Sequence, residues 1–202
     1  MSQTQKIASS SSPAERILNV ASELFYTQGY RATGINEVIQ KSGVAKATFY
    51  SHFPSKEDLA LAYLQLRKAH ELIYIDNAIA QAKGPRDRFF AVMHSLGPWL
   101  KETDFRGCVF LNIASEVPDH TSALRKEGGK LYTTIRSRVE ALSRELVASA
   151  PDKYGHLDPQ RLSRDYMVLF TGSLALCEIY HEIWPFEHGV QALHGLIGEK
   201  RE

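Results

Sequence analysis

The stretch from residue 33 to residue 56, TGINEVIQKSGVAKATFYSHFPSK, constrains the fold more than any other part of the sequence. Apolar residues recur at helical spacing on both sides of Ser42-Gly43, with Ile35, Val38 and Ile39 before it and Val44, Phe49 and Phe53 after it. Glycine interrupts a helical pattern and favours a tight turn. Two short helices joined by such a turn form a helix-turn-helix, and the pattern predicts this motif.

The second of these helices is predicted to carry a small, polar outer face. If its two phenylalanines face the core, then Ala47, Tyr50 and Ser51 point away from it. Such a face can enter the major groove of DNA, which is about 12 Å wide. Lys56, at the start of the next helix, is then placed to hold a phosphate together with free backbone amides. A helical hairpin that packs in a core without binding DNA gives the same pattern, so both interpretations stay open.

The run SGVAKATFYSHFPSKEDL, from Ser42 to Leu59, resembles the DNA-binding domain of the tetracycline-repressor (TetR) family of bacterial transcription regulators. The resemblance begins at residue 13 and includes the Gly-Val turn, the segment from Thr48 to Phe53 and the helix opening Ser55-Lys56-Glu57. It implies phosphate contacts by Thr33, Tyr50, His52 and Lys56, and an approach to bases by Lys46, Ala47, Thr48 and Ser51. It also implies that the helices after the DNA-binding domain enclose an effector pocket.

The composition is that of an ordinary globular chain, with 44% apolar residues, 23% charged residues and a net charge of +1. The first 56 positions contain six basic and three acidic residues, whereas the remainder is net acidic, so positive charge gathers around the motif. No run of about 18 apolar residues is present, and the start MSQTQKIASSSSP lacks the apolar centre of a signal peptide. We therefore expect a cytoplasmic protein with no membrane partner.

Helix signals divide the chain into an arm and two domains. Ser12-Pro13-Ala14-Glu15 combines a serine cap, a proline at the first helical position and a capping-box glutamate, and Gly29 ends that helix. Further helices are predicted at residues 55–84, 86–102, 105–117, 119 or 121 to 150, 159–184 and 186–199. The predicted fold is all-α: a disordered arm (1–11), an N-terminal three-helix helix-turn-helix DNA-binding domain (12–56) and a larger C-terminal helical domain for effector binding and dimerisation (57–202).

The helix predicted after Asp158-Pro159 is apolar on more than one side. Such a helix must be covered on both sides, and in a chain of this length a second copy is the expected cover. We predict that the last two helices pair with those of the second copy as a four-helix bundle. The predicted interface residues are Leu174, Cys177, Trp184, Val190, Leu193 and Ile197.

The second domain also combines aromatic side chains with scattered polar groups on apolar helices. Apolar walls with a few polar groups are typical of a small-molecule pocket, although each residue taken alone fits an ordinary core better. With the resemblance, the predicted lining is Trp99, Phe105, Cys108, Asn112, Glu116, Tyr132, Tyr166 and Phe170. The expected effector is an apolar or aromatic small molecule.

Cys108 follows Arg106-Gly107 at a predicted helix N-terminus, where the helix dipole and the guanidinium favour a reactive thiolate. Oxidation or alkylation there is an alternative input signal, and a small buried core thiol is the competing interpretation. Glu178 and His181 have the spacing of a carboxylate-bridged metal site, but such sites need the motif twice. We therefore expect no metal and no cofactor.

The sequence contains no GxSxG, phosphate-binding glycine loop or HExxH motif, and we predict no catalytic residues. The function predicted is a ligand-responsive homodimeric transcription regulator, a repressor that a small molecule releases from a palindromic operator in double-stranded DNA. Two alternatives are a thiol- or electrophile-sensing regulator that acts through Cys108 and a helical enzyme with a vestigial DNA-binding head, for which Cys108 with His120 or His181 supplies a conceivable dyad.

Overall fold

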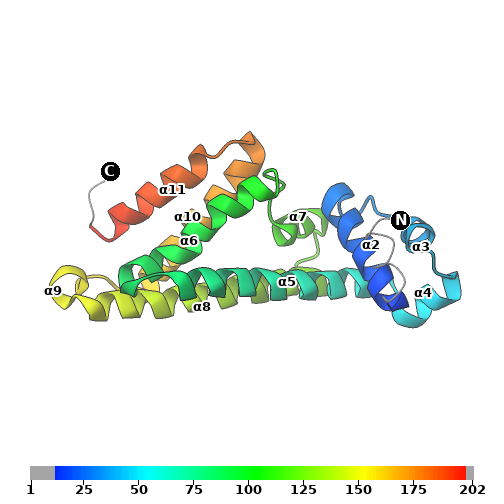
Figure 1. The fold of residues 1–202 in the computed structure, drawn as a ribbon, viewed down its shortest axis with the longest axis horizontal. Helices are drawn as coiled ribbons and strands as arrows, with labels where there is room; N and C mark the ends of the chain where they lie inside the picture. Colours follow the sequence, from blue (N-terminus) through cyan, green and yellow to red (C-terminus); the bar gives the residue numbers. More distant parts are fainter. Residues whose placement is uncertain (1–11, 199–202) are drawn as a thin grey trace, which may run out of the picture. The chain divides into compact units, whose positions relative to one another are not determined.

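The structure is a computed structural model that describes residues 12–198 (Figure 1). The predicted arm at residues 1–11 lies outside the described residues. Between residues 12 and 198 the fold is all-α, as predicted, and contains no strand. The helices are α2 (Pro13–Gln28), α3 (Ile35–Ser42), α4 (Lys46–His52), α5 (Lys56–Gln81), α6 (Gly84–Glu102), α7 (Val109–Glu116), α8 (Ala123–Ser149), α9 (Pro151–Tyr154), α10 (Pro159–Tyr180) and α11 (Trp184–Leu196).

Two compact units divide these helices, and neither is continuous in sequence. The first, which we call the head, comprises residues 12–67 and Val109–Gly128. The second, which we call the body, comprises Lys68–Cys108 and residues 129–198. This division differs from the predicted boundary at residue 56, because the first three turns of α5 and the whole of α7 belong to the head.

The head begins with the capping box that the sequence predicts. The backbone N–H of Glu15 donates to Ser12 Oγ at 3.2 Å, and the N–H of Ser12 donates to Glu15 Oε2 at 2.7 Å. From this start, α2 buries Ile17, Ala21, Leu24 and Phe25 and packs against α3 and α4. Along α5 the buried residues Leu59, Ala60, Tyr63 and Leu64 complete this core, which explains why the head extends past residue 56.

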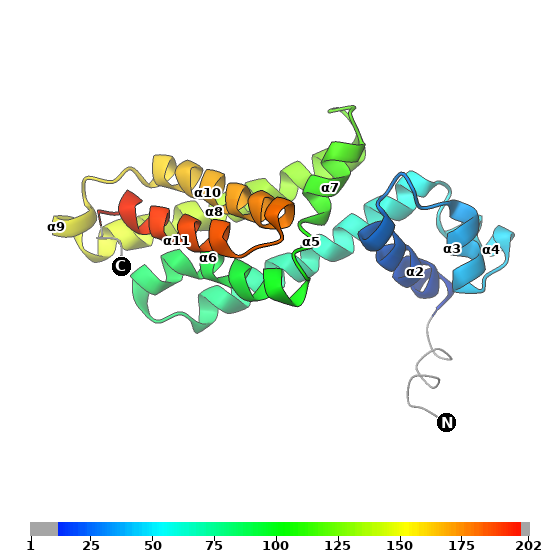
Figure 2. The ribbon, with the colours of Figure 1, turned by 90° about the horizontal axis from the view of Figure 1, so that it is seen from above.

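In the body, α6, α10 and α11 pack against one another, as Figures 1 and 2 both show. The Tyr166 hydroxyl lies in their core, where it accepts the backbone N–H of Met93 at 2.6 Å. Two ion pairs join α8 to its neighbours: Arg138 is bidentate to Asp76 of α5 at 2.7 Å, and Arg88 of α6 reaches Glu145 at 2.8 Å. Nowhere in residues 12–198 is a helix long and apolar enough to span a membrane.

Three of the differences from the predicted helices have a local physical reason. The predicted helix 105–117 begins only at Val109, because Asp104, Phe105 and Gly107 all have positive φ angles, which a right-handed helix does not accept. Pro185 does not end a helix but stands in the first turn of α11, where its missing N–H costs nothing. The four-residue α9 was not predicted, since one turn is too short to show periodicity.

Candidate nucleic-acid interface

The turn between α3 and α4 depends on the backbone of Gly43. This residue has φ 65° and ψ 27°, in the left-handed region that glycine adopts without a steric penalty. Its N–H donates to the carbonyl of Gln40 at 3.3 Å and so closes the end of α3. The chain then turns through Val44 and Ala45 into α4, which gives the helix-turn-helix that the sequence predicts.

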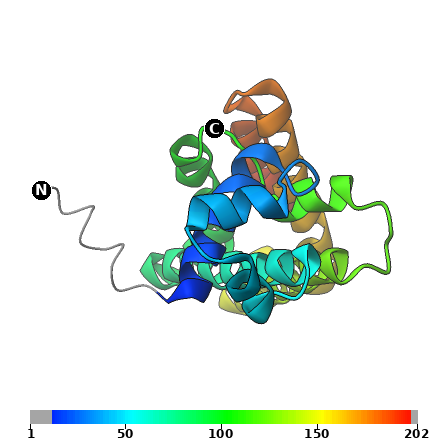
Figure 3. The ribbon, with the colours of Figure 1, turned by 90° about the vertical axis from the view of Figure 1, so that its right-hand side faces the viewer.

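Phe49 fixes which side of α4 faces inward. It is fully buried, its ring centroid lies 5.2 Å from that of Tyr50 and 6.3 Å from that of Phe53, and α4 packs against α2. Figure 3 views the head from the side on which α2, α3 and α4 face the reader. The exposed residues of α4 are Lys46, Ala47, Tyr50, Ser51 and His52, and Thr48 is half-buried. The outer face of α4 therefore combines the small side chains of Ala47 and Ser51 with basic Lys46 and the polar-tipped ring of Tyr50.

Lys56 lies at the first position of α5 and is half-buried. Its Nζ donates to the carbonyl of Arg31 at 3.1 Å and lies 4.7 Å from the ring centroid of Tyr30. Burial lowers the pKa of Lys56, and the negative charge of Glu116 opposes that shift. The ammonium thus lies beside the α2–α3 turn, residues 29–34, where it is bonded to a backbone carbonyl.

Thr33 is only 1% exposed, in contrast to the phosphate contact that the resemblance implies. Its hydroxyl donates to the carbonyl of Gly29 at 2.8 Å, so it stabilises the α2–α3 turn from within. The residue that precedes α3 as its N-cap is Gly34. In this structure Thr33 has no side-chain surface for DNA, and we do not retain it as a direct contact.

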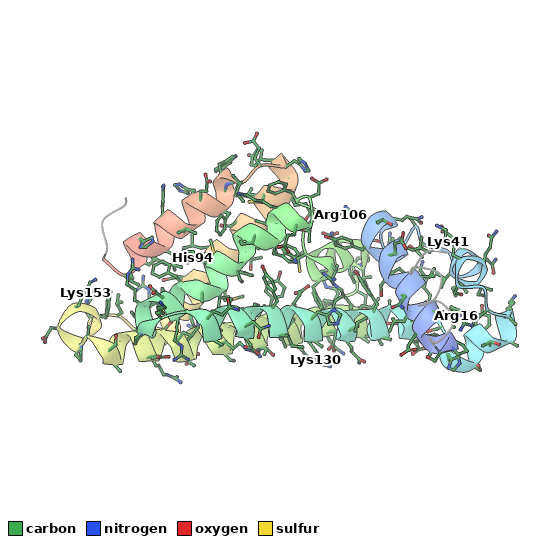
Figure 4. All side chains as sticks on the ribbon, in the orientation of Figure 1. Arg16, Lys41, His94, Arg106, Lys130 and Lys153 are labelled. Carbon is green, nitrogen blue, oxygen red and sulfur yellow. The ribbon has the colours of Figure 1, made fainter. Side chains whose placement is uncertain are left out.

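Other basic side chains of the head include Arg16 on α2 and Lys41 on α3, which Figure 4 marks. Lys41 Nζ lies 3.0 Å from Glu37 Oε1, one turn earlier on the same helix. An exposed pair of this kind contributes little stability, so Lys41 can exchange Glu37 for another anion at a small free-energy cost.

Glu116, the last residue of α7, was predicted to line an effector pocket, but its carboxylate contacts the head's own backbone. The N–H of Tyr30 donates to Oε1 at 3.1 Å, and the N–H of Arg31 donates to Oε2 at 2.5 Å. Gly29 leaves room for this approach, because a Cβ on that residue would lie 2.8 Å from Oε1. Nothing in the sequence indicates this contact, since the partners are 85 and 86 positions apart.

The other predicted pocket residues are distributed over both units. Asn112 belongs to the head with α7, whereas Trp99, Phe105, Cys108, Tyr132, Tyr166 and Phe170 belong to the body. Tyr166 and Phe170 are buried, and Phe105 packs against His181 with ring centroids 5.1 Å apart. The structure thus gives several of these side chains packing partners of their own, and the pocket lining stays a prediction.

Cys108 is 4% exposed, and its Sγ lies 3.6 Å from the hydroxyl of Tyr132, which donates to it. Burial, and secondarily the charge of Cys108, raise the pKa of Tyr132 far above its ordinary value, so this hydroxyl keeps its proton. A hydroxyl that stays protonated is a hydrogen-bond donor available to a thiolate. Cys177, the second cysteine, is also buried and unbridged.

Glu178 and His181, which have the spacing of a metal motif, each contact a different residue. The carboxylate of Glu178 lies directly against Gly107, which leaves no space for a Cβ there. The imidazole of His181 lies 3.5 Å from Asp104. Within residues 12–198 no three histidine, cysteine or acidic side chains are grouped so that they could hold a metal ion.

The predicted dimer residues are mostly interior to a single copy. Leu174, Cys177, Leu193 and Ile197 are buried in the body, so they cannot also face a partner. Trp184 is exposed and Val190 is half-buried. The exposed apolar side chains of α10 and the start of α11 are instead Val168, Leu176, Ile179, Tyr180 and Trp184.

Comparison with known proteins identifies related chains. A family model described as bacterial regulatory proteins, tetR family, matches residues 17–63. The transcriptional regulator LmrA of Bacillus subtilis is 30% identical over 133 residues, which span 65% of this chain and 71% of that protein. The transcriptional repressor NemR of Escherichia coli is 26% identical over 113 residues, 55% of this chain and 57% of that protein. A crystal structure of a TetR-family transcriptional regulator from Streptomyces coelicolor matches with a TM-score of 0.81 at 25% identity, covering 94% of this chain and 97% of that one.

Proposed function

The chain belongs to the TetR family of bacterial regulatory proteins and is a DNA-binding transcription regulator; we propose that it is a homodimeric repressor that a small molecule releases from a palindromic operator. The observation that carries the proposal is that α4 has a buried apolar inner side and an exposed polar outer side. Phe49 anchors the inner side in the head core, while Lys46, Ala47 and Ser51 are exposed on a side that presents small and basic groups. This is the surface that a helix needs to enter a major groove and approach base edges.

An exposed apolar face on the body supports the dimer. Of the eight large apolar side chains exposed between residues 12 and 198, five lie on α10 and the start of α11. Val168, Leu176, Ile179 and Tyr180 recur at helical spacing and form an apolar stripe on α10, and the ring centroid of Trp184, at the start of α11, lies 5.3 Å from that of Tyr180. A contiguous apolar face on an otherwise polar surface marks an interaction site, and a second copy offers the same stripe in return. A dimer would present two α4 helices to half-sites about 34 Å apart.

Release by an effector requires two states of the dimer with different affinities for the ligand. A molecule that binds both states equally shifts nothing, so the effector must prefer the state that does not fit the operator. We place the effector among the aromatic side chains of the body, with Tyr132 as a polar group beside it. The repressor assignment is also supported by NemR, a relative that is named as a repressor.

Selection of bound sequences from a random duplex library, at about physiological salt, tests the proposal. The expected result is a palindrome with half-sites about one helical turn apart, which a titration then confirms as the preferred sequence. Failure to enrich any sequence, both before and after the protein is unfolded and refolded without ligand, would overturn the proposal. The refolding step separates a repressor already occupied by its effector from a protein that does not read DNA.

A second input chemistry, modification of Cys108, is favoured by the hydroxyl of Tyr132 at 3.6 Å. A donor at the sulfur stabilises the thiolate, which is the form that reacts with electrophiles. Because Cys108 is 4% exposed, its reaction rate should follow local opening of the body. Alkylation kinetics of the native protein, with Cys108→Ser as the control, test this alternative; release of operator DNA by an electrophile in wild type and equally in Cys108→Ser would exclude it.

A further inference from the structure

The α2–α3 turn is fixed by contacts from two other parts of the head. Residues 29–34 connect α2 to the first helix of the helix-turn-helix, and they contain no regular element of their own. Glu116 accepts the N–H groups of Tyr30 and Arg31, and Lys56 donates to the carbonyl of Arg31. A turn that leads directly into α3 is therefore held by one carboxylate and one ammonium.

Arg31 stands between these two charges. Its N–H points to Glu116 Oε2 at 2.5 Å, and its C=O receives Lys56 Nζ at 3.1 Å. Hydrogen bonds in which one partner is ionised are about twice as strong as neutral ones. The position of the Lys56 ammonium is thus tied through one backbone residue to the carboxylate of Glu116, and the charge of Glu116 also acts on Lys56 directly.

We propose that Glu116 is a positioning residue for DNA binding: its carboxylate orders the α2–α3 turn and, through Arg31, sets where Lys56 is presented. The inference rests on the proposed function, because it assigns Lys56 to a DNA phosphate. Glu116 itself touches no DNA. Its role is to order the α2–α3 turn before DNA binds. Without it, the entropy cost of ordering the turn would be paid on binding and would weaken the affinity for DNA.

If Glu116 positions the turn, its removal should change the affinity for DNA in the direction opposite to the one that charge repulsion alone predicts. An acidic side chain near DNA repels it, so its neutralisation should strengthen binding. If Glu116 instead positions the turn, its removal weakens binding. The number of phosphates neutralised does not change, so the dependence of affinity on salt should keep its slope.

The experiment compares wild type, Glu116→Gln and Glu116→Ala, with Glu23→Gln as the matched control. Glu23 is an exposed glutamate of α2, and its replacement removes the same charge from the same unit. Each protein is titrated with the selected operator duplex over a range of salt, and amide hydrogen exchange is followed at Tyr30 and Arg31. Helix content and thermal unfolding establish that each variant is folded.

The expected order of affinity is wild type, then Glu116→Gln, then Glu116→Ala, with a total loss of about tenfold at unchanged salt slope. Exchange at Tyr30 and Arg31 should accelerate in the same order, because glutamine keeps a neutral acceptor and alanine keeps none. Glu23→Gln should leave amide exchange as in wild type and should bind the operator as tightly as wild type or slightly more tightly, as the loss of a repelling charge predicts. If wild type binds the operator selectively and Glu116→Ala binds it equally or more tightly, the inference about Glu116 is overturned and the proposed function stands. Absence of selective binding by wild type overturns the proposed function and the inference with it.

Discussion

The outer faces of α4 and α10 show two ways in which a helix can present side chains that its own unit does not need. On α4 the exposed groups are the short side chains of Ala47 and Ser51, the charged Lys46 and the polar rings of Tyr50 and His52, and the helix is held from behind by the single buried ring of Phe49. On α10 the exposed groups are large and apolar, including Val168 and Ile179, each 72% exposed, while Tyr166, Leu174 and Cys177 fill the core behind them. Both helices have a complete inner face, so each outer face is available for a partner.

The chemistry of each face indicates its partner. A polar and basic face gains little from burial against protein, but it matches the phosphates and base edges of DNA. An apolar face gains roughly 25 cal/mol for each Å² removed from water, and it finds the same chemistry on a second copy of itself. In the proposed dimer, the outer face of α4 would bind the operator and the outer face of α10 would hold the two copies together.

The largest expected effect comes from the inner side of α4. Phe49→Ala removes the one fully buried ring of this helix and should lower the free energy of unfolding by about 3–5 kcal/mol. Chemical denaturation monitored by helix content measures the loss. A variant as stable as wild type would show that α4 is held by contacts other than this ring.

A substitution on the outer side of α10 should weaken dimerisation and leave the folding stability of each protomer unchanged. Ile179→Glu places a charge in the proposed interface and should weaken the dimer by about 2 kcal/mol or more, while each protomer stays folded. Sedimentation at micromolar concentration measures the mass. The matched control is Ile73→Glu on α5, also an exposed isoleucine, which should leave the dimer intact. A dimer that persists in Ile179→Glu would place the interface elsewhere.

Lys46, on the outer face of α4, is expected to affect which operator is preferred. If its ammonium reaches a guanine, Lys46→Ala should change discrimination at one base pair by about 1–3 kcal/mol. Titration of operator duplexes with single substitutions locates the position. Lys41→Ala, which removes an equal charge from α3, is the control and should leave the discrimination between base pairs unchanged. Equal loss of binding to operator and random DNA would show that Lys46 contacts only a phosphate.

The smallest expected effect is that of Lys56→Ala. Removal of one phosphate contact should weaken binding to all sequences alike and reduce the slope of log affinity against log salt by about one unit. Titrations at several salt concentrations measure this slope. An unchanged slope with unchanged affinity would mean that the ammonium stays on Arg31 when DNA is bound.

The sequence was sufficient for the parts of the fold that local interactions determine. The capping box at Ser12 and Glu15, the glycine turn at Gly43 and the cap at Asp158 are all present, because each involves residues only a few positions apart. Family membership was predicted from the same region, since the residues from Ser42 to Leu59 carry it. Most of the exposed face of α4 also follows directly from helical spacing and the burial of Phe49.

Contacts between distant segments were not predictable from the sequence. One local contact was missed as well: Thr33 was expected to contact a phosphate, but its hydroxyl donates to the carbonyl of Gly29, four positions earlier, and its side chain is buried in the turn. Glu116 was expected in a pocket, because helical spacing shows which residues share a face but not what that face meets. For the same reason the sequence did not show which apolar residues of α10 face the core and which face outward. Leu174 was predicted in the interface but is buried, whereas Ile179 is exposed.

The discontinuous head has a consequence for protein engineering. A chimera that joins this DNA-binding domain to another sensor would ordinarily be cut once, between α4 and α5 or within α5. Such a graft would leave behind Val109–Gly128, and with it the carboxylate that holds Tyr30 and Arg31. The transplantable unit is therefore made of two pieces of sequence, and a fusion that keeps operator recognition should carry both.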